Sequence, residues 1–146
     1  MNKLKLIIIT FIISMNFNLL NAQSIEEIIK GRKAMFSENY QTGKKISILL
    51  KSKKIEEAKP LMKKMSANYK KLLDYFPENT KEGFKTEALP SIWENKDEFN
   101  ALMQKASDDM LKLAKAIDTA EDLRAVQKEL MWSNCSACHS RFRAPH

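Results

Sequence analysis

The sequence contains few of the residues that build tight turns. Its 146 residues include only three glycines and four prolines, too few for the many turns of a β-sandwich or barrel. The abundant lysine, glutamate, alanine, leucine and methionine favour helices instead. The length excludes a large multidomain enzyme, and a hydrophobic content of 44% argues against disorder. We therefore predict one all-α domain.

Long apolar runs are scarce as well, and the most prominent run lies at the N-terminus. Residues Leu6–Met15 follow two lysines and are too short for a comfortable membrane span, but they have the length of the apolar segment of a secretory signal. We predict cleavage after Ala22, removal of residues 1–22, and export to the periplasm. The mature domain would then span residues 23–146. An uncleaved N-terminal anchor is the alternative, because Leu20 matches the cleavage pattern poorly.

A large excess of charge of one sign is also missing. Removal of the signal leaves 23 basic and 18 acidic residues, a net charge of +5. This mild excess specifies no partner. We expect neither a nucleic acid nor, once the signal is removed, a membrane as a partner.

The chain has only two cysteines, and they stand close together in the segment Cys135-Ser136-Ala137-Cys138-His139. A disulfide across so short a loop would contribute little to stability by chain closure, which points to local chemistry. Two thiols at this spacing can add to the two vinyl groups of a haem, and the adjacent imidazole can bind its iron. On a helix, Cys135, Cys138 and His139 share one face. We predict one covalent haem c, with His139 as the metal ligand.

Other uses of the cysteine pair need features that the sequence does not offer. A thioredoxin-like redox site needs a βαβ setting. A structural zinc site needs a fourth ligand, and the only other histidine is His146 at the chain end. A plain disulfide makes no use of His139. An alternative of another class is a secreted, haem-free helical interaction module with an inert cysteine pair.

Four stretches with apolar residues at helical spacing follow the signal. The first begins with a capping-box pattern at Ser24 and Glu27, and the fourth opens with a similar pattern at Thr119 and Asp122. The four helices are expected at residues 24–50, 55–76, 97–117 and 119 to the C-terminus. Residues 77–94 are the weakest in pattern and are expected to form a crossover loop. This arrangement predicts an antiparallel four-helix bundle, in which cofactors lie between facing helices.

Several of these segments together resemble a known family. They are Ile29-Lys30-Gly31-Arg32, Pro90-Ser91-Ile92-Trp93, Phe99, and the stretch from Cys135 to Arg143. The chain resembles the class II c-type cytochromes, the cytochrome c′ family, in which the haem motif also lies near the C-terminus. The resemblance covers residues 24–146 and implies a four-helix bundle with the haem near the last helix.

The resemblance also implies roles for individual residues. Cys135 and Cys138 would hold the haem through thioethers, and His139 would be the proximal iron ligand. Arg143, one helical turn later, would lie beside the proximal imidazole. Arg32 and Lys33 would meet the haem edge, where two cations suit the propionates. Glu87 of the crossover would also approach the haem.

The chain departs from the family pattern on the distal side of the haem. In relatives, the residue four places after the arginine faces the open side of the iron, and here that residue is Phe36. A methionine stands one place earlier, at Met35, which on a helix is a rotation of about 100°. Phenylalanine cannot ligate iron, so we expect a five-coordinate iron under an apolar lid. The alternative is a six-coordinate electron-transfer cytochrome with Met35 as the sixth ligand.

The function that the resemblance implies is binding of nitric oxide or carbon monoxide, electron transfer, or both. No general base, nucleophile or substrate cleft can be identified in the sequence, so we expect no enzymatic activity. The resemblance also implies a homodimer through the first two helices. The redox partner is left open.

Overall fold

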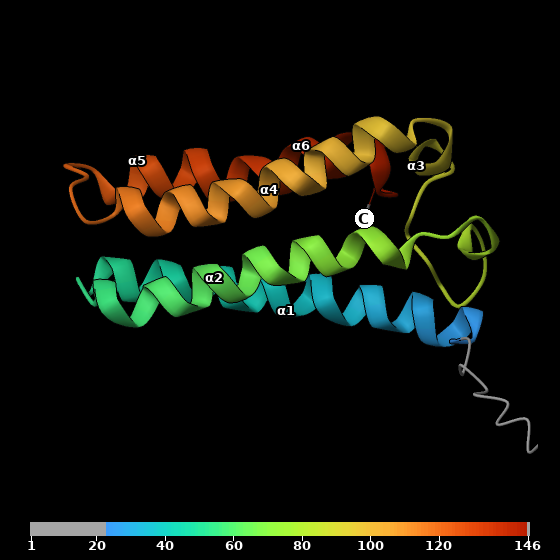
Figure 1. Cartoon of the computed structure of the whole chain (residues 1–146), viewed down its shortest axis with the longest axis horizontal. Helices are drawn as coiled ribbons and strands as arrows, with labels where there is room; N and C mark the ends of the chain where they lie inside the picture. The colour runs from blue at the N-terminus through green and yellow to red at the C-terminus, as the bar shows by residue number, and fades with distance from the viewer. Residues whose placement is uncertain (1–22, 146) are drawn as a thin grey trace, which may run out of the picture.

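The computed structural model describes residues 23–145, so the predicted signal at residues 1–22 lies outside it. Figure 1 shows two layers of paired helices. The helices are α1 (Ile25–Lys51), α2 (Ile55–Leu72), α3 (Ser91–Glu94), α4 (Lys96–Ala116), α5 (Leu123–Gln127) and α6 (Ser133–Phe142). One layer contains α1 and α2, and the other contains α4 and the terminal segment with α5 and α6. This confirms the all-α four-helix bundle. Within residues 23–145, every helix is too short or too polar to cross a bilayer.

The helix starts follow from capping side chains. At the start of α1, Ser24 Oγ accepts a hydrogen bond from the Glu27 amide at 3.2 Å, and the Glu27 carboxylate accepts one from the Ser24 amide at 2.8 Å. The predicted capping box is therefore present. The predicted start of the fourth helix at Thr119 is wrong by a few residues. Asp122 caps α5, because its carboxylate accepts hydrogen bonds from the backbone amides of Arg124 and Ala125.

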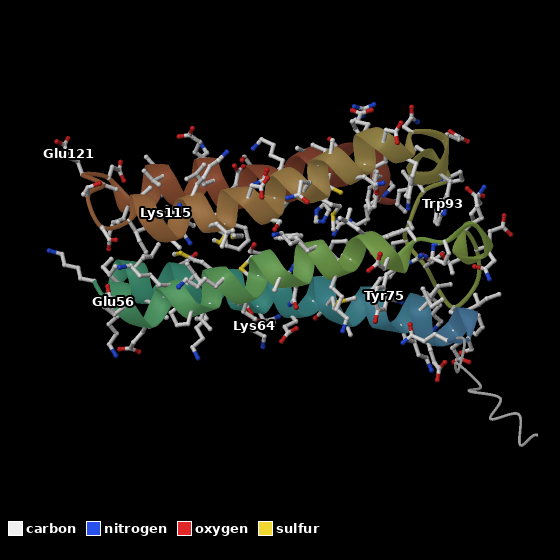
Figure 2. All side chains as sticks on the ribbon, viewed as in Figure 1. Glu56, Lys64, Tyr75, Trp93, Lys115 and Glu121 are labelled. Carbon is white, nitrogen blue, oxygen red and sulfur yellow. The ribbon has the colours of Figure 1, made fainter. Side chains whose placement is uncertain are left out.

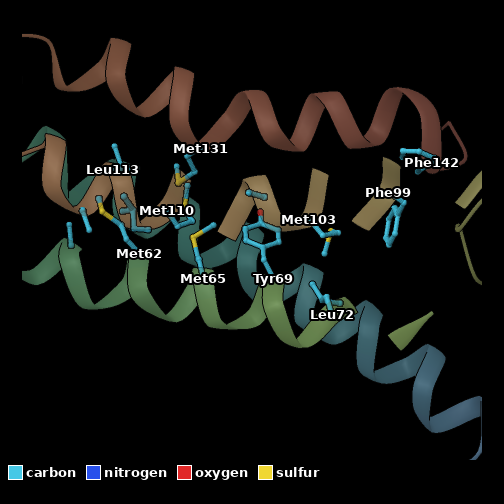
Figure 3. Close-up of a cluster of buried hydrophobic side chains, with 14 of the residues drawn as sticks. Met62, Met65, Tyr69, Leu72, Phe99, Met103, Met110, Leu113, Met131 and Phe142 are labelled. Atoms are coloured by element: carbon cyan, nitrogen blue, oxygen red, sulfur yellow. The ribbon is translucent and has the colours of Figure 1, made fainter. Parts of the chain in front are cut away.

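The core between the two layers is rich in methionine (Figure 3). Met62 and Met65 of α2 are buried, as are Met103 and Met110 of α4. The flexible methionine side chain fills irregular gaps between helices. Small residues bring these two helices close at one level, where the hydroxyls of Ser66 and Ser107 are 2.8 Å apart. The α2–α4 pair thus anchors the bundle on which the site is built.

The predicted crossover loop, residues 77–94, contains two short helical turns, η2 (Glu78–Thr80) and α3. A third turn, η1 (Leu73–Tyr75), replaces the end of the second helix, which was predicted to be regular up to residue 76. Between η2 and α3, three consecutive residues have positive φ: Gly83 at 91°, Phe84 at 49° and Lys85 at 54°. The Thr86 amide donates to the Gly83 carbonyl at 3.0 Å and closes the turn. Left-handed backbone at phenylalanine and lysine is strained, because the Cβ crowds the following carbonyl.

This strain predicts that a better turn sequence stabilises the protein. The double change Phe84→Asn with Lys85→Gly installs residues that tolerate left-handed backbone. Because Phe84 is 48% exposed, little packing is lost. We expect the free energy of unfolding to rise by about 1–2 kcal/mol, measured by urea denaturation of the haem-loaded protein. The control Glu82→Gly, at a residue outside the positive-φ set, should lower stability, and a less stable double variant would contradict the account.

The C-terminal helical segment is interrupted just before the cysteine motif. A π-helical turn, η3 (Lys128–Trp132), joins α5 to α6. Its wider turn was not predicted from the sequence, because an apolar pattern does not distinguish one π turn inside a helix. Met131 of this turn is buried and Trp132 packs against Tyr40 of α1, with ring centroids 6.2 Å apart. The π turn therefore lies where the last helix meets α1.

Candidate haem site

A cavity of about 670 Å³ lies between the two layers at the crossover end of the bundle. Its walls come from α1, the end of α2, the crossover, α4 and α6. Every side chain that the sequence predicts for the site lines this cavity: Arg32, Lys33, Phe36, Glu87, Cys135, Cys138, His139 and Arg143. These residues come from three segments far apart in the chain, and the fold brings them together.

The cysteine motif enters the cavity from α6. Cys135, Cys138 and His139 all line it, as expected for one face of a helix. The two cysteines form no disulfide with each other, and both are partly buried. Burial raises the pKa of Cys135 above its usual value and that of Cys138 to about 11. His139 is exposed as well as lining the cavity, so the cavity opens to solvent along α6.

The end of α6 is tied to the crossover by backbone pairing. The Leu89 amide donates to the Phe142 carbonyl at 3.1 Å, and the Ala144 amide donates to the Glu87 carbonyl at 2.8 Å. These bonds flank an antiparallel bridge between Ala88 and Arg143. Sequence periodicity gave no sign of it. The pairing brings the predicted residues Glu87 and Arg143 to one rim of the cavity.

Arg32 is buried and holds the crossover against α1. Its guanidinium donates to the Tyr75 carbonyl at 3.2 Å and to the Thr80 carbonyl and hydroxyl at 2.9 Å each. It also donates to the Thr86 hydroxyl at 2.7 Å. Burial lowers the pKa of Arg32 to about 10, so it stays charged at neutral pH. The neighbouring Gly31 allows this approach, because a Cβ there would lie 2.7 Å from the Tyr75 ring.

The other predicted cations differ in how they are engaged. The ammonium of Lys33 donates to the Lys85 carbonyl at 2.9 Å, which places it beside the strained turn. The Nε atom of Arg143 is buried and has no hydrogen-bond partner within the described residues. A buried, unpaired guanidinium nitrogen is costly unless an acceptor reaches it. Arg143 is therefore suited to a carboxylate brought by a bound group.

The α1 wall of the cavity contains Phe36. Met35 is partly buried against the core and is not among the lining residues. Phe36 lies edge-to-face with Phe76, with ring centroids 6.4 Å apart. The opposing α6 wall carries His139. Of the two residues considered for the distal position, Phe36 and Met35, only Phe36 lines the cavity, and its side chain has no atom that can bind iron.

Two polar residues of the cavity wall were missed in the sequence. Asn39 of α1 is 3% exposed, and its carbonyl oxygen accepts a hydrogen bond from Asn68 at 2.9 Å, while its own nitrogen has no hydrogen-bond partner among residues 23–145. Tyr69 of α2 is also buried, and burial raises the pKa of its phenol far above the usual value. The phenol lies near Cys135. Tyr69 stood in the apolar pattern of α2 and was assigned to the core, which hid its place at the site.

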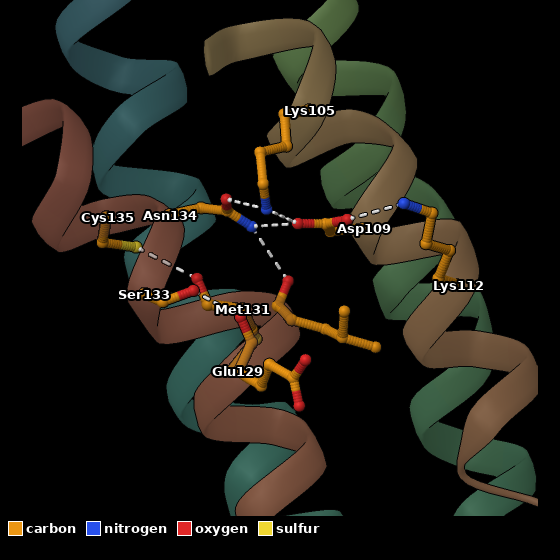
Figure 4. Close-up of polar contacts among 9 residues, drawn as sticks. Lys105, Asp109, Lys112, Glu129, Met131, Ser133, Asn134 and Cys135 are labelled. Atoms are coloured by element: carbon orange, nitrogen blue, oxygen red, sulfur yellow. Dashed lines mark hydrogen bonds and ion pairs between the residues drawn. The ribbon is translucent and has the colours of Figure 1, made fainter.

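A buried carboxylate supports the start of α6 (Figure 4). Asp109 of α4 is 1% exposed and accepts hydrogen bonds from Lys105, from Lys112 at 3.2 Å and from Asn134 at 3.1 Å. Burial acts to raise the pKa of Asp109, but these donors outweigh it and lower the pKa below its usual value. Because Asn134 directly precedes Cys135, the network fixes the cysteine-bearing helix to α4.

These residues fit a covalent haem. The cavity is of the size that holds a cofactor. Two thiols and an imidazole reach it from one helix, and much of the remaining wall is aromatic or aliphatic. The orphaned Nε of Arg143 offers a donor to an acidic group. The donor set therefore matches the chemistry of a haem with two vinyl groups and propionates.

Comparison with known proteins agrees with this fit. The family model described as cytochrome c′ matches residues 27–143. The cytochrome c′ of Rhodopseudomonas palustris is 31% identical over 121 residues, which are 81% of this chain and 82% of that protein. The match thus includes the cysteine motif and nearly the whole bundle.

Solved structures give the same result. The structure of cytochrome c′ from Rhodopseudomonas palustris superposes with a TM-score of 0.65 at 29% identity, covering 84% of this chain and 98% of that one. A nitric oxide complex of a cytochrome c′ mutant from Alcaligenes xylosoxidans has a TM-score of 0.70 at 21% identity, over the same shares of the two chains, and shows likeness of fold alone. The chain therefore belongs to the cytochrome c′ family and carries one covalent haem c near its C-terminal helix.

Proposed function

We propose that the protein is an exported, periplasmic haem protein that binds small diatomic gases, nitric oxide or carbon monoxide, at an iron with one protein ligand. The haem supplies an iron with a position for such a ligand and a one-electron redox couple. The boundaries at residues 1–22 and 23–146 are part of this proposal. It describes a binding protein rather than an enzyme, and its haem excludes the inert helical module as an alternative.

The chain's own residues have separate roles in the proposal. Cys135 and Cys138 hold the group by thioethers, and His139 provides the nitrogen ligand. Arg143 offers its unpaired Nε at the rim beside that ligand. Glu87 lines the same rim, and its backbone is paired with the C-terminal segment.

Arg32 and Lys33 act mainly on the crossover in this proposal. Four hydrogen bonds from Arg32 go to oxygens of the crossover and of the η1 turn before it, so most of its donors are already used. Its positive charge still lies on the cavity wall, where it favours an anionic group. Lys33 contributes a second positive charge from an exposed position.

The observation that carries the proposal is the presence of Phe36, and the absence of Met35, on the α1 wall of the cavity. A phenyl ring can exclude water and restrict access, but it cannot donate an electron pair to iron. Within the predicted pair, only Met35 could form that bond, and it packs against the core instead. An open coordination position suits a gas ligand better than fast electron transfer. A nitric oxide complex of a mutant relative supports the choice of ligand.

Electron transfer is the second candidate function. It is supported by the opening of the cavity along α6, where His139 is exposed. An exposed haem edge at this opening would allow a partner to approach. A six-coordinate electron carrier would require α1 to be rotated so that Met35, in place of Phe36, lines the cavity.

The ferrous absorption spectrum tests the coordination directly. We expect the reduced wild-type protein to be high-spin and to form a carbon monoxide complex without displacing a protein ligand. The variant His139→Ala should keep its tethered haem and change this spectrum, because the nitrogen ligand is lost. A low-spin wild-type spectrum, or a His139→Ala spectrum identical to wild type, would contradict the proposal.

A further inference from the structure

Charge is distributed very unevenly between the two layers of the bundle. Residues 25–72, which contain α1 and α2, have thirteen basic and five acidic residues. Residues 73–146 have ten basic and thirteen acidic residues. The modest net charge therefore hides a strongly positive helix pair, here called the basic hairpin (residues 25–72), packed on a slightly negative layer. Figure 2 shows Lys64 pointing outward from the hairpin.

Most of these lysines are not neutralised within the protein. In the described part of the chain, four hairpin lysines form ion pairs with carboxylates. The exposed lysines that form none and do not line the haem cavity are Lys44, Lys45, Lys51, Lys53, Lys63, Lys70 and Lys71. Their charges face solvent and lie at intervals along both helices. Such a surface attracts an extended anionic partner.

A large apolar side chain is exposed among these lysines. Ile48 of α1 is 65% exposed, whereas Tyr40, although 54% exposed, packs against Trp132 of the other layer and lines the haem cavity. Ile48 lies close in sequence to Lys44, Lys45 and Lys51. Exposed apolar side chains beside lysines can enter the boundary between lipid head groups and acyl chains.

We propose that the basic hairpin is a docking surface for an anionic lipid bilayer. Its helices of 27 and 18 residues offer a long surface, and the haem cavity lies elsewhere, between the layers. Its exposed cations are lysines, which act as point charges toward phosphate and do not select one geometry. Each lysine near an anionic bilayer adds about fivefold to binding. The cysteine-bearing helix lies in the other layer.

The same charges oppose the homodimer that the family resemblance implies. A dimer through α1 and α2 would bring two surfaces with an excess of basic residues together. Like charges across such an interface weaken association. The basic hairpin is therefore better matched to an anionic surface than to a second copy of itself.

Vesicle flotation of the haem-loaded protein tests this proposal, with the visible haem band as the tracer. We expect binding to phosphatidylcholine vesicles that contain about one-third phosphatidylglycerol, and little binding to phosphatidylcholine alone. Raising the salt to about 0.5 M should release the protein, because the attraction is screened. Equal binding to neutral vesicles, or no binding at low salt, would overturn the proposal.

Matched variants separate the hairpin from the rest of the surface. Lys45→Glu with Lys71→Glu should weaken binding by at least about tenfold. The control Lys115→Glu with Arg124→Glu makes the same charge change on the other layer and should weaken it far less. Equal loss in both pairs would show that only net charge matters and would overturn the assignment to the hairpin.

The apolar contribution has its own pair of variants. Ile48→Ser should reduce vesicle binding several-fold, whereas Leu111→Ser, at a 37% exposed residue of α4, should not. A surface built for an acidic protein would instead bind soluble polyglutamate as tightly as vesicles and ignore Ile48, which would also overturn the proposal. The carbon monoxide spectrum of each variant should match wild type. The lipid result thus stands or falls independently of the gas-binding function.

Discussion

Replacing both Cys135 and Cys138 by alanine is expected to abolish the haem that survives acid–acetone extraction. The two thiols lie on the cavity side of α6, and no other cysteine exists in the chain to form a thioether. Without the bound group, a cavity of about 670 Å³ would be left between the layers. Loss of a large apolar body from a core costs several kcal/mol, so the unfolding midpoint should fall sharply as well.

Single variants and a neighbouring serine provide the controls for this experiment. Cys135→Ala and Cys138→Ala should each leave one attachment point and lower the yield of covalent haem. Ser136→Ala changes the same segment without touching a thiol and should behave as wild type. Full retention of extraction-resistant haem in the double cysteine variant would contradict the assigned attachment site.

The variant Phe36→Ala is expected to accelerate binding of carbon monoxide to the ferrous protein by about tenfold or more. The barrier in the proposed site is displacement of the phenyl ring, and no bond to a sixth ligand has to break. The ferrous spectrum without added ligand should stay high-spin. Stopped-flow mixing with carbon monoxide measures the rate, and an unchanged rate would show that Phe36 does not restrict access.

Met35→Ala is the matched control, one residue away on the same helix. Since Met35 is only partly buried, we expect a stability loss of about 1–2 kcal/mol, with the ferrous spectrum and the carbon monoxide rate unchanged. A low-spin wild-type protein that becomes high-spin in Met35→Ala would make Met35 the sixth ligand. The protein would then be a dedicated electron carrier.

The bundle and the residues of the site were predictable because both depend on local spacing. Apolar residues at helical intervals predicted the helices, and the Ser24 capping box marked the first start within one residue. The Cys135-x-x-Cys138-His139 spacing predicted the face that lines the cavity. These signals act within a few turns of helix, where the sequence alone determines geometry.

The contacts around the site depend on long-range packing and were not predictable. The four hydrogen bonds of Arg32 reach residues 43 to 54 positions away. The bridge between Ala88 and Arg143 joins the crossover to the chain end. The burial of Asp109 depends in the same way on its contact with Asn134, 25 residues later in the chain. Likewise, the net charge gave no indication of the basic hairpin, because a sum over the chain conceals which helices carry the lysines.

The π turn Lys128–Trp132 has a consequence for how the molecule opens. The i→i+5 hydrogen bonds of this turn interrupt the i→i+4 hydrogen bonds of the α-helix, so α5 and α6 need not unfold together. Upstream, Gln127 is held to Ser47 of α1, and downstream, Asn134 is held to Asp109 of α4. Fraying that starts at the C-terminus can therefore stop at this turn. In amide hydrogen exchange, residues 133–142 should lose protection before residues 123–127, which makes the haem-bearing helix a separate opening unit of the bundle.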